Sequence, residues 1–210
     1  MNTLDYQRIL HEIKNSATLI NSSMQLLNKK CPQLQSESYW NNICQEITYL
    51  KNIVLEISYA GNLTQSRKEP VDLHSILQDT CKTVQDTFPN IDFTFHLCDN
   101  LPNISGDVTK LRQAILNLIK NAAEADSASI TITTESEPSL VRMIIADSGT
   151  GIPADLEDKV FDLFTTTKKQ GTGLGLAITK QIIEYHGGTL LLKNHPGKGC
   201  TFTICIPVAK

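Results

Sequence analysis

The first sixty residues repeat apolar side chains at alternating spacings of three and four positions. One run comprises Tyr6, Leu10, Ile13, Ala17, Ile20, Met24 and Leu27. A second run has the same spacing and comprises Trp40, Ile43, Ile47, Leu50, Val54 and Ile57. This heptad pattern packs one helix lengthwise against others. We therefore expect helices over about 5–27 and 39–62, separated at 29–38 by a polar cluster with Pro32.

Two such helices joined by a short loop form an antiparallel helical hairpin. A hairpin alone buries only part of each seam, and pairing two copies into a four-helix bundle buries the rest, so we predict a homodimer. The alternative is that the hairpin packs on the remainder of its own chain. The polar segment Thr64–Pro70 predicts a linker, which divides the chain into residues 1–65 (hairpin) and 66–210 (a second domain).

Beyond the linker, helical and strand patterns alternate. Helical patterns cover Leu73–Phe88, a run from the N-cap candidate Asp107 to Ala125, and Leu174–Tyr185. Strand patterns cover Ile91–Leu97, Ser129–Glu135, Leu140–Asp147, Thr189–Asn194 and Thr201–Pro207. This order indicates an α/β sandwich, a mostly antiparallel sheet with helices on one face, so that the whole chain is of the α+β class.

Charge and composition exclude several classes of protein. The net charge of −3 does not indicate a basic surface that binds nucleic acid. No apolar run approaches the length of a membrane span, and no signal-peptide pattern opens the chain. The six cysteines form no CxxC pair or metal-spaced cluster, which favours reduced thiols over an extracellular disulfide framework. We therefore expect a cytoplasmic location.

Asn117 and Asn121 lie four residues apart in the string Asn-Leu-Ile-Lys-Asn-Ala-Ala-Glu-Ala, on one face of a helix. Amide oxygens are hard ligands that suit Mg²⁺. The string Asp147-Ser-Gly149-Thr-Gly151 directly follows an apolar strand. Its carboxylate can accept a hydrogen bond from an exocyclic amine, and its glycines let the backbone approach a flat ring. Taken singly, these strings are more commonly a solvated helix face and a turn.

Two further strings complete the set. Phe161–Lys169 lies in a long irregular stretch, where threonine and lysine side chains can reach phosphate groups. Gly171-Thr-Gly-Leu-Gly-Leu176 runs into a helix, whose N-terminal backbone N–H groups bind phosphate. A dinucleotide-binding fingerprint is excluded because the glycines follow a loop and not a strand, and a P-loop is excluded because no Gly-Lys-Ser/Thr is present.

The four strings together resemble the N, G1, F and G2 boxes of the ATP-binding domain of two-component histidine kinases, a GHKL (Bergerat) fold shared with gyrase, heat-shock-90 chaperones and MutL. The hairpin resembles that family's dimerisation and histidine-phosphotransfer domain, whose H-box begins His-Glu, as in His11-Glu12. The resemblance covers nearly the whole chain and implies a protein histidine kinase. ATP and Mg²⁺ would be its cofactors, and a response regulator receiver domain its partner.

The resemblance also implies roles for individual residues. Asn121, assisted by Asn117, would bind Mg²⁺, Asp147 would bind the adenine amine, and Lys168 would neutralise phosphate charge, with Lys120 a further candidate. The remaining nucleotide-binding candidates are glycines beside the base and residues of the lid: Gly149, Gly151, Gly171, Thr172, Gly173, Leu174 and Gly175. Asn117 stands where the gyrase-like ATPases have a glutamate that activates water, which favours transfer over hydrolysis.

His11 would attack the γ-phosphate, and Glu12 would accept a hydrogen bond from the other imidazole nitrogen. Asn15, one helical turn beyond His11, would orient water for dephosphorylation of the response regulator. The alternative to this role is that Glu12 is an ordinary solvent-exposed glutamate on the helix.

Three departures from the family pattern stand out. Ser16 replaces a proline that often follows the H-box asparagine, which puts bending of the helix in doubt. Ser148 stands where asparagine is common, and no sensor or membrane segment precedes the hairpin, so we expect either a short soluble kinase or the core of a larger one. The competing hypotheses are a phosphorelay adaptor without ATP-driven activity, and a conformational ATPase or serine kinase of the same superfamily.

Overall fold

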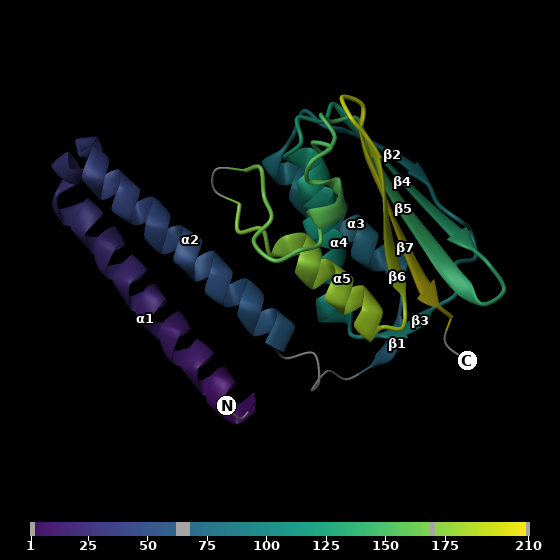
Figure 1. The fold of residues 1–210 in the computed structure, drawn as a ribbon, viewed down its shortest axis with the longest axis horizontal. Helices are drawn as coiled ribbons and strands as arrows, with labels where there is room; N and C mark the ends of the chain where they lie inside the picture. The colour runs from purple at the N-terminus through teal and green to yellow at the C-terminus, as the bar shows by residue number, and fades with distance from the viewer. Residues whose placement is uncertain (1–2, 62–67, 169–170, 209–210) are drawn as a thin grey trace.

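The computed structural model describes residues 3–61, 68–168 and 171–208, and among these the side chains of all but 3–11, 55–56 and 58–61. A helical hairpin is followed by a domain in which three helices cover one face of a five-stranded sheet (Figure 1). This arrangement confirms the α+β class predicted from the sequence. None of the helices in the described ranges is both long enough and apolar enough to cross a membrane.

The hairpin consists of α1 (Thr3–Lys30) and α2 (Ser38–Gly61), joined by the short 3₁₀ helix η1 (Pro32–Ser36). Trp40 Nε1 donates to Asn28 Oδ1 at 2.5 Å and ties the two helices together beside the loop. Ala17, Met24 and Val54 are buried inside the hairpin. Both predicted helices are confirmed, and α1 extends past its predicted end by three residues.

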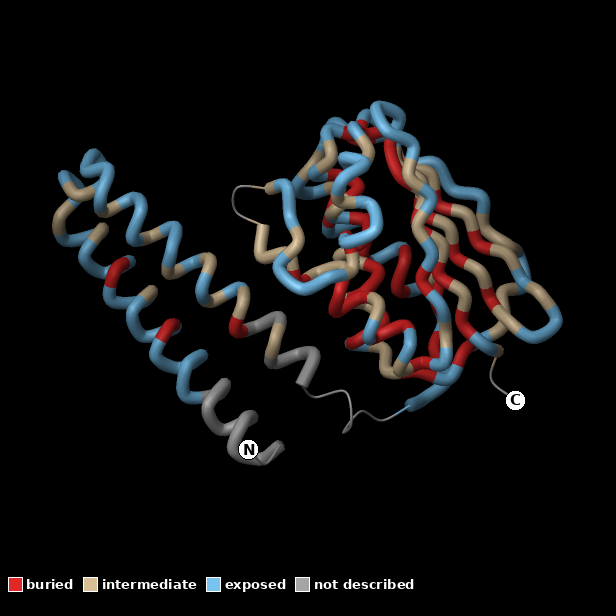
Figure 2. The backbone as a smooth tube through the Cα atoms, in the orientation of Figure 1, coloured by how far each residue is buried: buried red, intermediate tan, exposed pale blue. Residues whose placement is uncertain are grey.

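Five other residues of the two seams remain accessible within one chain. They occur seven residues apart on each helix, and their exposed fractions lie between 40% and 50%: Ile13, Ile20, Leu27, Ile43 and Leu50. Figure 2 shows the consequence as a hairpin with few buried positions beside a domain with a continuous buried layer. One chain therefore satisfies only half of the heptad pattern.

The main sheet has the order β2-β4-β5-β7-β6, with all its pairs antiparallel except β2 with β4. Its strands are β2 (Asp92–His96), β4 (Ser129–Ser136), β5 (Leu140–Asp147), β6 (Thr189–His195) and β7 (Gly199–Pro207). Burial alternates along β4, β5 and β7, as expected for a sheet covered on one face. The five strands predicted from the sequence are all present, with small shifts of their ends.

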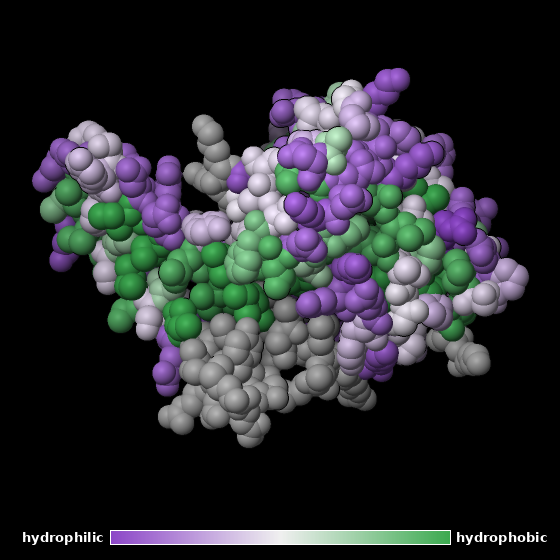
Figure 3. All heavy atoms as spheres, in the orientation of Figure 1, coloured by the Kyte–Doolittle hydropathy of each residue, from purple (hydrophilic) through white to green (hydrophobic). Residues whose placement is uncertain are grey.

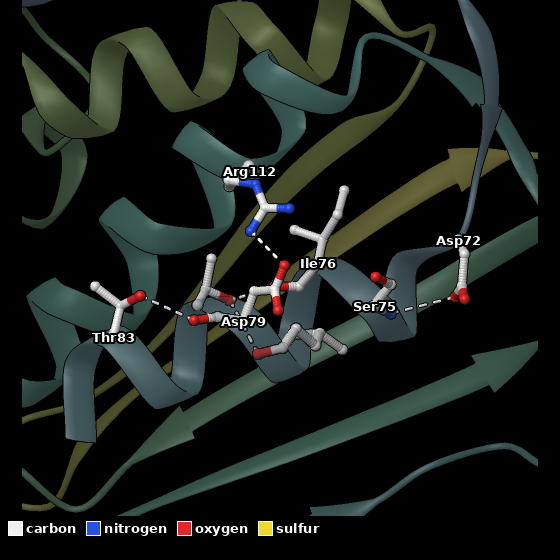
Figure 4. Close-up of polar contacts among 8 residues, drawn as sticks. Asp72, Ser75, Ile76, Asp79, Thr83 and Arg112 are labelled. Atoms are coloured by element: carbon white, nitrogen blue, oxygen red, sulfur yellow. Dashed lines mark hydrogen bonds and ion pairs between the residues drawn. The ribbon is translucent and has the colours of Figure 1, made fainter. Parts of the chain in front are cut away.

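The covering helices are α3 (Leu73–Thr87), α4 (Val108–Ala123) and α5 (Gly175–Tyr185), with the 3₁₀ turn η3 (Glu157–Lys159) between β5 and α5. Asp72 caps α3 by accepting from the backbone N–H groups of His74 and Ser75. An ion pair between Arg112 Nη1 and Asp79 Oδ2 at 2.9 Å links α4 to α3 (Figure 4). The predicted N-cap of α4, Asp107, accepts from Lys110 N at 3.0 Å and is confirmed.

The sequence analysis missed a second, two-stranded sheet formed by β1 (Glu69–Val71) and β3 (Ile104–Gly106). Each strand has three residues, too few for a period of two to stand out. Because β1 begins at Glu69, the predicted linker Thr64–Pro70 is too long at its C-terminal end. The predicted boundary between residues 65 and 66 falls outside the described residues and stays a prediction.

Buried His186, at the end of α5, fastens this small sheet and α4 to α5. Its Nδ1 lies 2.6 Å from Ile182 O, and its Nε2 lies 2.9 Å from Asp107 N. A backbone N–H can only donate, so Nε2 accepts and Nδ1 carries the proton. Burial of the imidazole disfavours its charged form and so lowers the pKa of His186 from the ordinary value of 6.5. The neutral ring thus holds the start of α4, the helix that carries Asn117 and Asn121.

Candidate functional site

A cavity of about 740 Å³ lies beside α4, between the loops on either side of η3 and the start of α5. This volume suits a nucleotide-sized ligand. Its lining includes Asn52 of α2 and many of the predicted site residues: Asn117, Lys120, Asn121, Asp147, Gly151, Lys168, Gly171, Thr172, Gly173 and Gly175. Four strings spread over some sixty residues of sequence therefore meet around one cavity.

Asp147 ends β5, and its carboxylate is fixed in place by hydrogen bonds. Oδ1 accepts from Gly149 N at 2.9 Å and from Ser127 Oγ at 3.4 Å, while Oδ2 accepts from Cys200 N at 3.1 Å. These donors come from the following turn, the segment after α4, and β7. Because its donors lie on three different elements, the carboxylate is held rigidly at one end of the cavity and retains lone pairs for a ligand amine.

The Asp147–Gly151 turn packs closely against the end of α4. Thr150 N donates to Ala125 O at 3.0 Å, and a Cβ on Gly149 would lie only 2.4 Å from the same oxygen. Any side chain at Gly149 would therefore push the turn away from the helix. Two of the predicted nucleotide-binding residues, Gly149 and Leu174, are not among the residues that line the cavity. Leu174 is a core residue, 2% exposed, so its side chain faces away from the cavity.

Asn117 and Asn121 project from α4 toward the cavity, as their spacing predicts. Asn117 Nδ2 donates to Thr179 Oγ1 of α5 at 2.9 Å, and its amide lies against Gly175, where an added Cβ would be 2.5 Å from Asn117 Oδ1. Asn121 Oδ1 instead accepts from Lys168 Nζ at 2.9 Å. The two amides thus have different partners: Asn117 supports the start of α5, and Asn121 faces the loop before it.

A backbone hydrogen bond between Phe164 and Gly173 connects the glycine-rich segment before α5 to the preceding loop. Phe164 N donates to Gly173 O at 2.9 Å, and both residues have positive φ, 66° each. A Cβ on Gly173 would lie 2.4 Å from the Phe164 carbonyl carbon, so only glycine fits there. Thr172 Oγ1 accepts from Leu174 N at 3.3 Å at the entry to α5.

Several residues around the cavity were not anticipated. Asn194 of β6 binds the loop after Asp147 through both backbone groups of Ile152, each at 2.9 Å. Cys200 holds Asp147 through its backbone N–H, and burial, followed by the charge of Asp147, raises the pKa of the Cys200 thiol to about 11. These residues are neighbours only through strand pairing, which a single sequence does not reveal. Glu124 is different, because it lies seven residues beyond Asn117 on the same helical face.

The hairpin candidates lie on α1. Glu12 and Asn15 are exposed, and the His11 side chain falls outside the described residues although its backbone is helical. Ser16 lies within an uninterrupted helix, so the helix continues through the position where the family often has proline. From α2, Asn52 reaches the cavity lining, and Ile53 and Ile57 pack against the core of the sheet domain. The hairpin therefore contacts the same domain whose cavity it adjoins.

Comparisons with known proteins agree with this geometry. A sequence model described as histidine kinase-, DNA gyrase B- and HSP90-like ATPase matches residues 106–210. The histidine kinase AtoS of Escherichia coli is 32% identical over 95% of this chain and 34% of its own length. The kinase/phosphatase NtrB of Azospirillum brasilense is 32% identical over 94% of this chain and 54% of its own. The chain thus spans between a third and about half of these relatives.

A solved structure extends the match to both parts of the fold. The histidine kinase ThkA, crystallised with the response regulator TrrA, superposes with a TM-score of 0.67 over 96% of this chain and 60% of the solved chain, at 29% identity. The family match, these relatives and the meeting of the four strings around one cavity agree with one another. The chain belongs to the histidine kinase-, DNA gyrase B- and HSP90-like ATPase family and has the catalytic core of a two-component histidine kinase.

Proposed function

We propose that this chain uses ATP with Mg²⁺ to phosphorylate its own His11 and then passes the phosphoryl group to an aspartate of a response regulator. One observation carries the proposal. A single cavity brings together the fixed carboxylate of Asp147, the amide of Asn121 and the glycine-rich entry to α5, on a chain whose hairpin bears His11 and contacts the same domain. ATP supplies the phosphoryl group, and Mg²⁺ neutralises phosphate charge.

The residues present fit both ligands. Asp147 keeps acceptor capacity for the adenine amine, with Gly151 lining the same end of the cavity. At the other end, the Asn121 oxygen is the candidate metal ligand, assisted by Asn117. The backbone of Gly171–Gly175 and the Lys168 ammonium would bind the phosphates, with Lys120 in a lesser role. Leu174 would act through its backbone, because its side chain is in the core.

On the hairpin, transfer asks mainly for positioning, and a rigid helix supplies it. Glu12 would hold the second imidazole nitrogen of His11, and Asn15 would position water when the phosphorylated regulator is hydrolysed. The names of two relatives support the later steps: NtrB is described as a kinase/phosphatase, and ThkA was crystallised with a response regulator. We assign this core to the cytoplasm, in agreement with the free thiols of all six cysteines.

The working unit in this proposal is a homodimer. Ile13, Ile20, Leu27, Ile43 and Leu50 are accessible at regular seven-residue intervals on two neighbouring helices. Figure 3 shows hydrophobic residues along the hairpin surface. A regular stripe of this kind is what a second hairpin would cover in a four-helix bundle. Contact between α2 and its own sheet domain accounts for Ile53 and Ile57 but leaves the stripe accessible.

Labelling with γ-labelled ATP tests the proposal. We expect acid-labile, base-stable label on the wild-type chain, and loss of that label in His11→Gln. His195→Gln, which changes an exposed histidine at the end of β6, is the matched control and should label normally. Equal labelling of His11→Gln would exclude His11 as the acceptor. Steady phosphate release with no phosphohistidine would instead favour a conformational ATPase.

A further inference from the structure

The side-chain ammonium of Lys168 forms a hydrogen bond and an ion pair with residues at the C-terminal end of α4. Its Nζ lies 2.9 Å from Asn121 Oδ1 and 2.5 Å from Glu124 Oε2. The side chains of Lys168 and Glu124 are 36% and 29% exposed, so the pair is partly shielded from water. Partial shielding and a second hydrogen bond make this contact stronger than an ordinary surface ion pair. The ammonium therefore joins the loop before α5 to the candidate metal ligand.

The two residues that bind Lys168 lie with Asn117 on one face of α4 and its C-cap. Asn117, Asn121 and Glu124 occur at positions 0, 4 and 7, and all of them line the cavity. An amide oxygen and a carboxylate oxygen side by side form a hard, negatively charged pair that suits a cation. Glu124 Oε1 is also within 3.5 Å of Lys120 Nζ, but the Lys120 side chain is 58% exposed. Lys168 is thus the more shielded of the two cations at Glu124.

The backbone around Lys168 fixes where its side chain begins. Lys168 N donates to Thr166 Oγ1 at 3.1 Å, and Lys168 O accepts from Gly171 N at 3.1 Å. At the base of this segment, Phe164 and Gly173 are hydrogen-bonded to each other. The contact of Lys168 with α4 is made by its side chain alone, so it can break without disturbing either of these backbone contacts.

We propose that Lys168 and Glu124 form a latch, in which the ammonium occupies the Asn121 oxygen until the metal-nucleotide arrives. The inference deepens the proposed function and rests on Asn121 as the metal ligand. An ammonium and a divalent cation cannot share one amide oxygen, because like charges that close repel strongly. Lys168 must therefore leave Asn121, and it is then available to the phosphates. Glu124 is a positioning residue that acts through Lys168.

Hydrogen exchange on the nucleotide-free, full-length chain tests the latch independently of kinase activity. Lys168→Gln and Glu124→Gln should each speed exchange of the amides of Thr165–Lys168 and Gly171–Thr172 by about fivefold, a factor equivalent to ~1 kcal/mol. The double variant should exchange no faster than either single variant. Lys159→Gln removes an exposed charge on η3, Glu184→Gln removes one at the C-terminal end of α5, and both variants should match the wild type. Unchanged exchange in both latch variants would overturn the proposal.

Metal dependence gives a second readout. At saturating non-hydrolysable ATP analogue, Lys168→Gln should lower the Mg²⁺ concentration for half-maximal binding by about threefold, because the competing cation is gone. In the Lys168→Gln background, Glu124→Gln should change nothing further. A higher Mg²⁺ requirement for Glu124→Gln in both backgrounds would make Glu124 a metal ligand and refute its positioning role. If the wild-type chain does not bind the nucleotide analogue, the proposed function fails, while hydrogen exchange still decides the latch.

Discussion

The hairpin and the sheet domain solve the problem of burying apolar side chains differently. In the sheet domain, one continuous core joins α3, α4 and α5 to the sheet, and many of its side chains, including those of Ile104, Leu118 and Ile132, are fully buried. In the hairpin, Ala17, Met24 and Val54 are buried, while the five residues of the stripe, Ile13, Ile20, Leu27, Ile43 and Leu50, stay 40–50% exposed. Figure 2 shows this contrast directly. The sheet domain buries its apolar side chains within one chain, whereas the apolar stripe of the hairpin is buried only when another surface covers it.

This difference separates recognition of the nucleotide from assembly. The hydrogen bonds described above for Asp147 and Asn121 come from within the sheet domain. The stripe on α1 and α2 lies on a separate part of the chain. Substitutions in one region should therefore leave the property of the other unchanged, and three experiments test that independence in order of expected effect.

The largest effect is expected at Asp147. In Asp147→Asn, an NH₂ group must face either Cys200 N or the Gly149 and Ser127 donors, and a charged acceptor is lost. We expect ATP affinity to fall by at least ~100-fold, about 3 kcal/mol. Asp162→Asn, at an exposed position, is the control. Calorimetry measures binding and light scattering measures assembly. A change in oligomeric state in Asp147→Asn would break the proposed separation between the regions.

Local sequence patterns predicted most of the helices and strands. The types and spacing of the polar and glycine residues also predicted most of the residues that line the cavity. The heptads specified both hairpin helices, and the alternating apolar residues of Ile91–Leu97 specified β2. The Asn117–Asn121 spacing correctly placed both amides on one face of α4. Glu124 was within reach of the same argument, since it continues that face by one turn.

Contacts that depend on topology were not predictable. Cys200 holds Asp147 because β7 lies beside β5, and Asn194 fixes the following loop from β6. Neither residue carries a local signal. The three-residue strands β1 and β3 are too short to show a period, and the parallel pairing of β2 with β4 depends on the crossover between them, which runs through α4. Leu174 was assigned to the nucleotide because it lies in the glycine-rich string, but its side chain belongs to the core.

An effect similar in size to that at Asp147, but confined to assembly, is expected in the stripe. In Leu50→Lys, a 43% exposed leucine is replaced by a cation on both copies of α2. Loss of apolar burial at about 2 kcal/mol per side chain should weaken the dimer by roughly 100- to 1,000-fold. Gln45→Lys places the same charge on an exposed position outside the stripe and should remain dimeric. Sedimentation over a range of concentrations measures both variants.

Nucleotide binding by monomeric Leu50→Lys should match the wild type, because no residue of the stripe lines the cavity among the residues described. If the wild-type chain itself sediments as a monomer throughout, the stripe is covered by something other than a second copy. Dimers that persist in Leu50→Lys would also contradict the assignment of the stripe as the interface.

The smallest effect, a pH dependence, belongs to the sheet domain alone. Burial lowers the pKa of His186 in the folded chain below its ordinary 6.5, with Lys68 and Lys110 acting in the same direction and Asp107 opposing. The stabilisation is therefore present above pH 6.5 and is lost as pH falls from 6.5 toward the folded pKa. Protonation places an N–H on Nε2 opposite the Asp107 N–H and breaks that hydrogen bond. We expect a loss of ~1 kcal/mol.

Urea unfolding at pH 7.5 and 5.5 measures this loss, with circular dichroism following the whole chain. The single tryptophan, Trp40, lies on α2, so its fluorescence reports the hairpin separately. His186→Phe keeps a ring but lacks Nε2, and it should be less stable at pH 7.5 yet lose less stability on acidification. His96→Gln, at an exposed position, should retain the wild-type pH dependence. An equal acid shift in Trp40 fluorescence would show that the hairpin and the sheet domain unfold together, because α2 packs on the domain through Ile53 and Ile57.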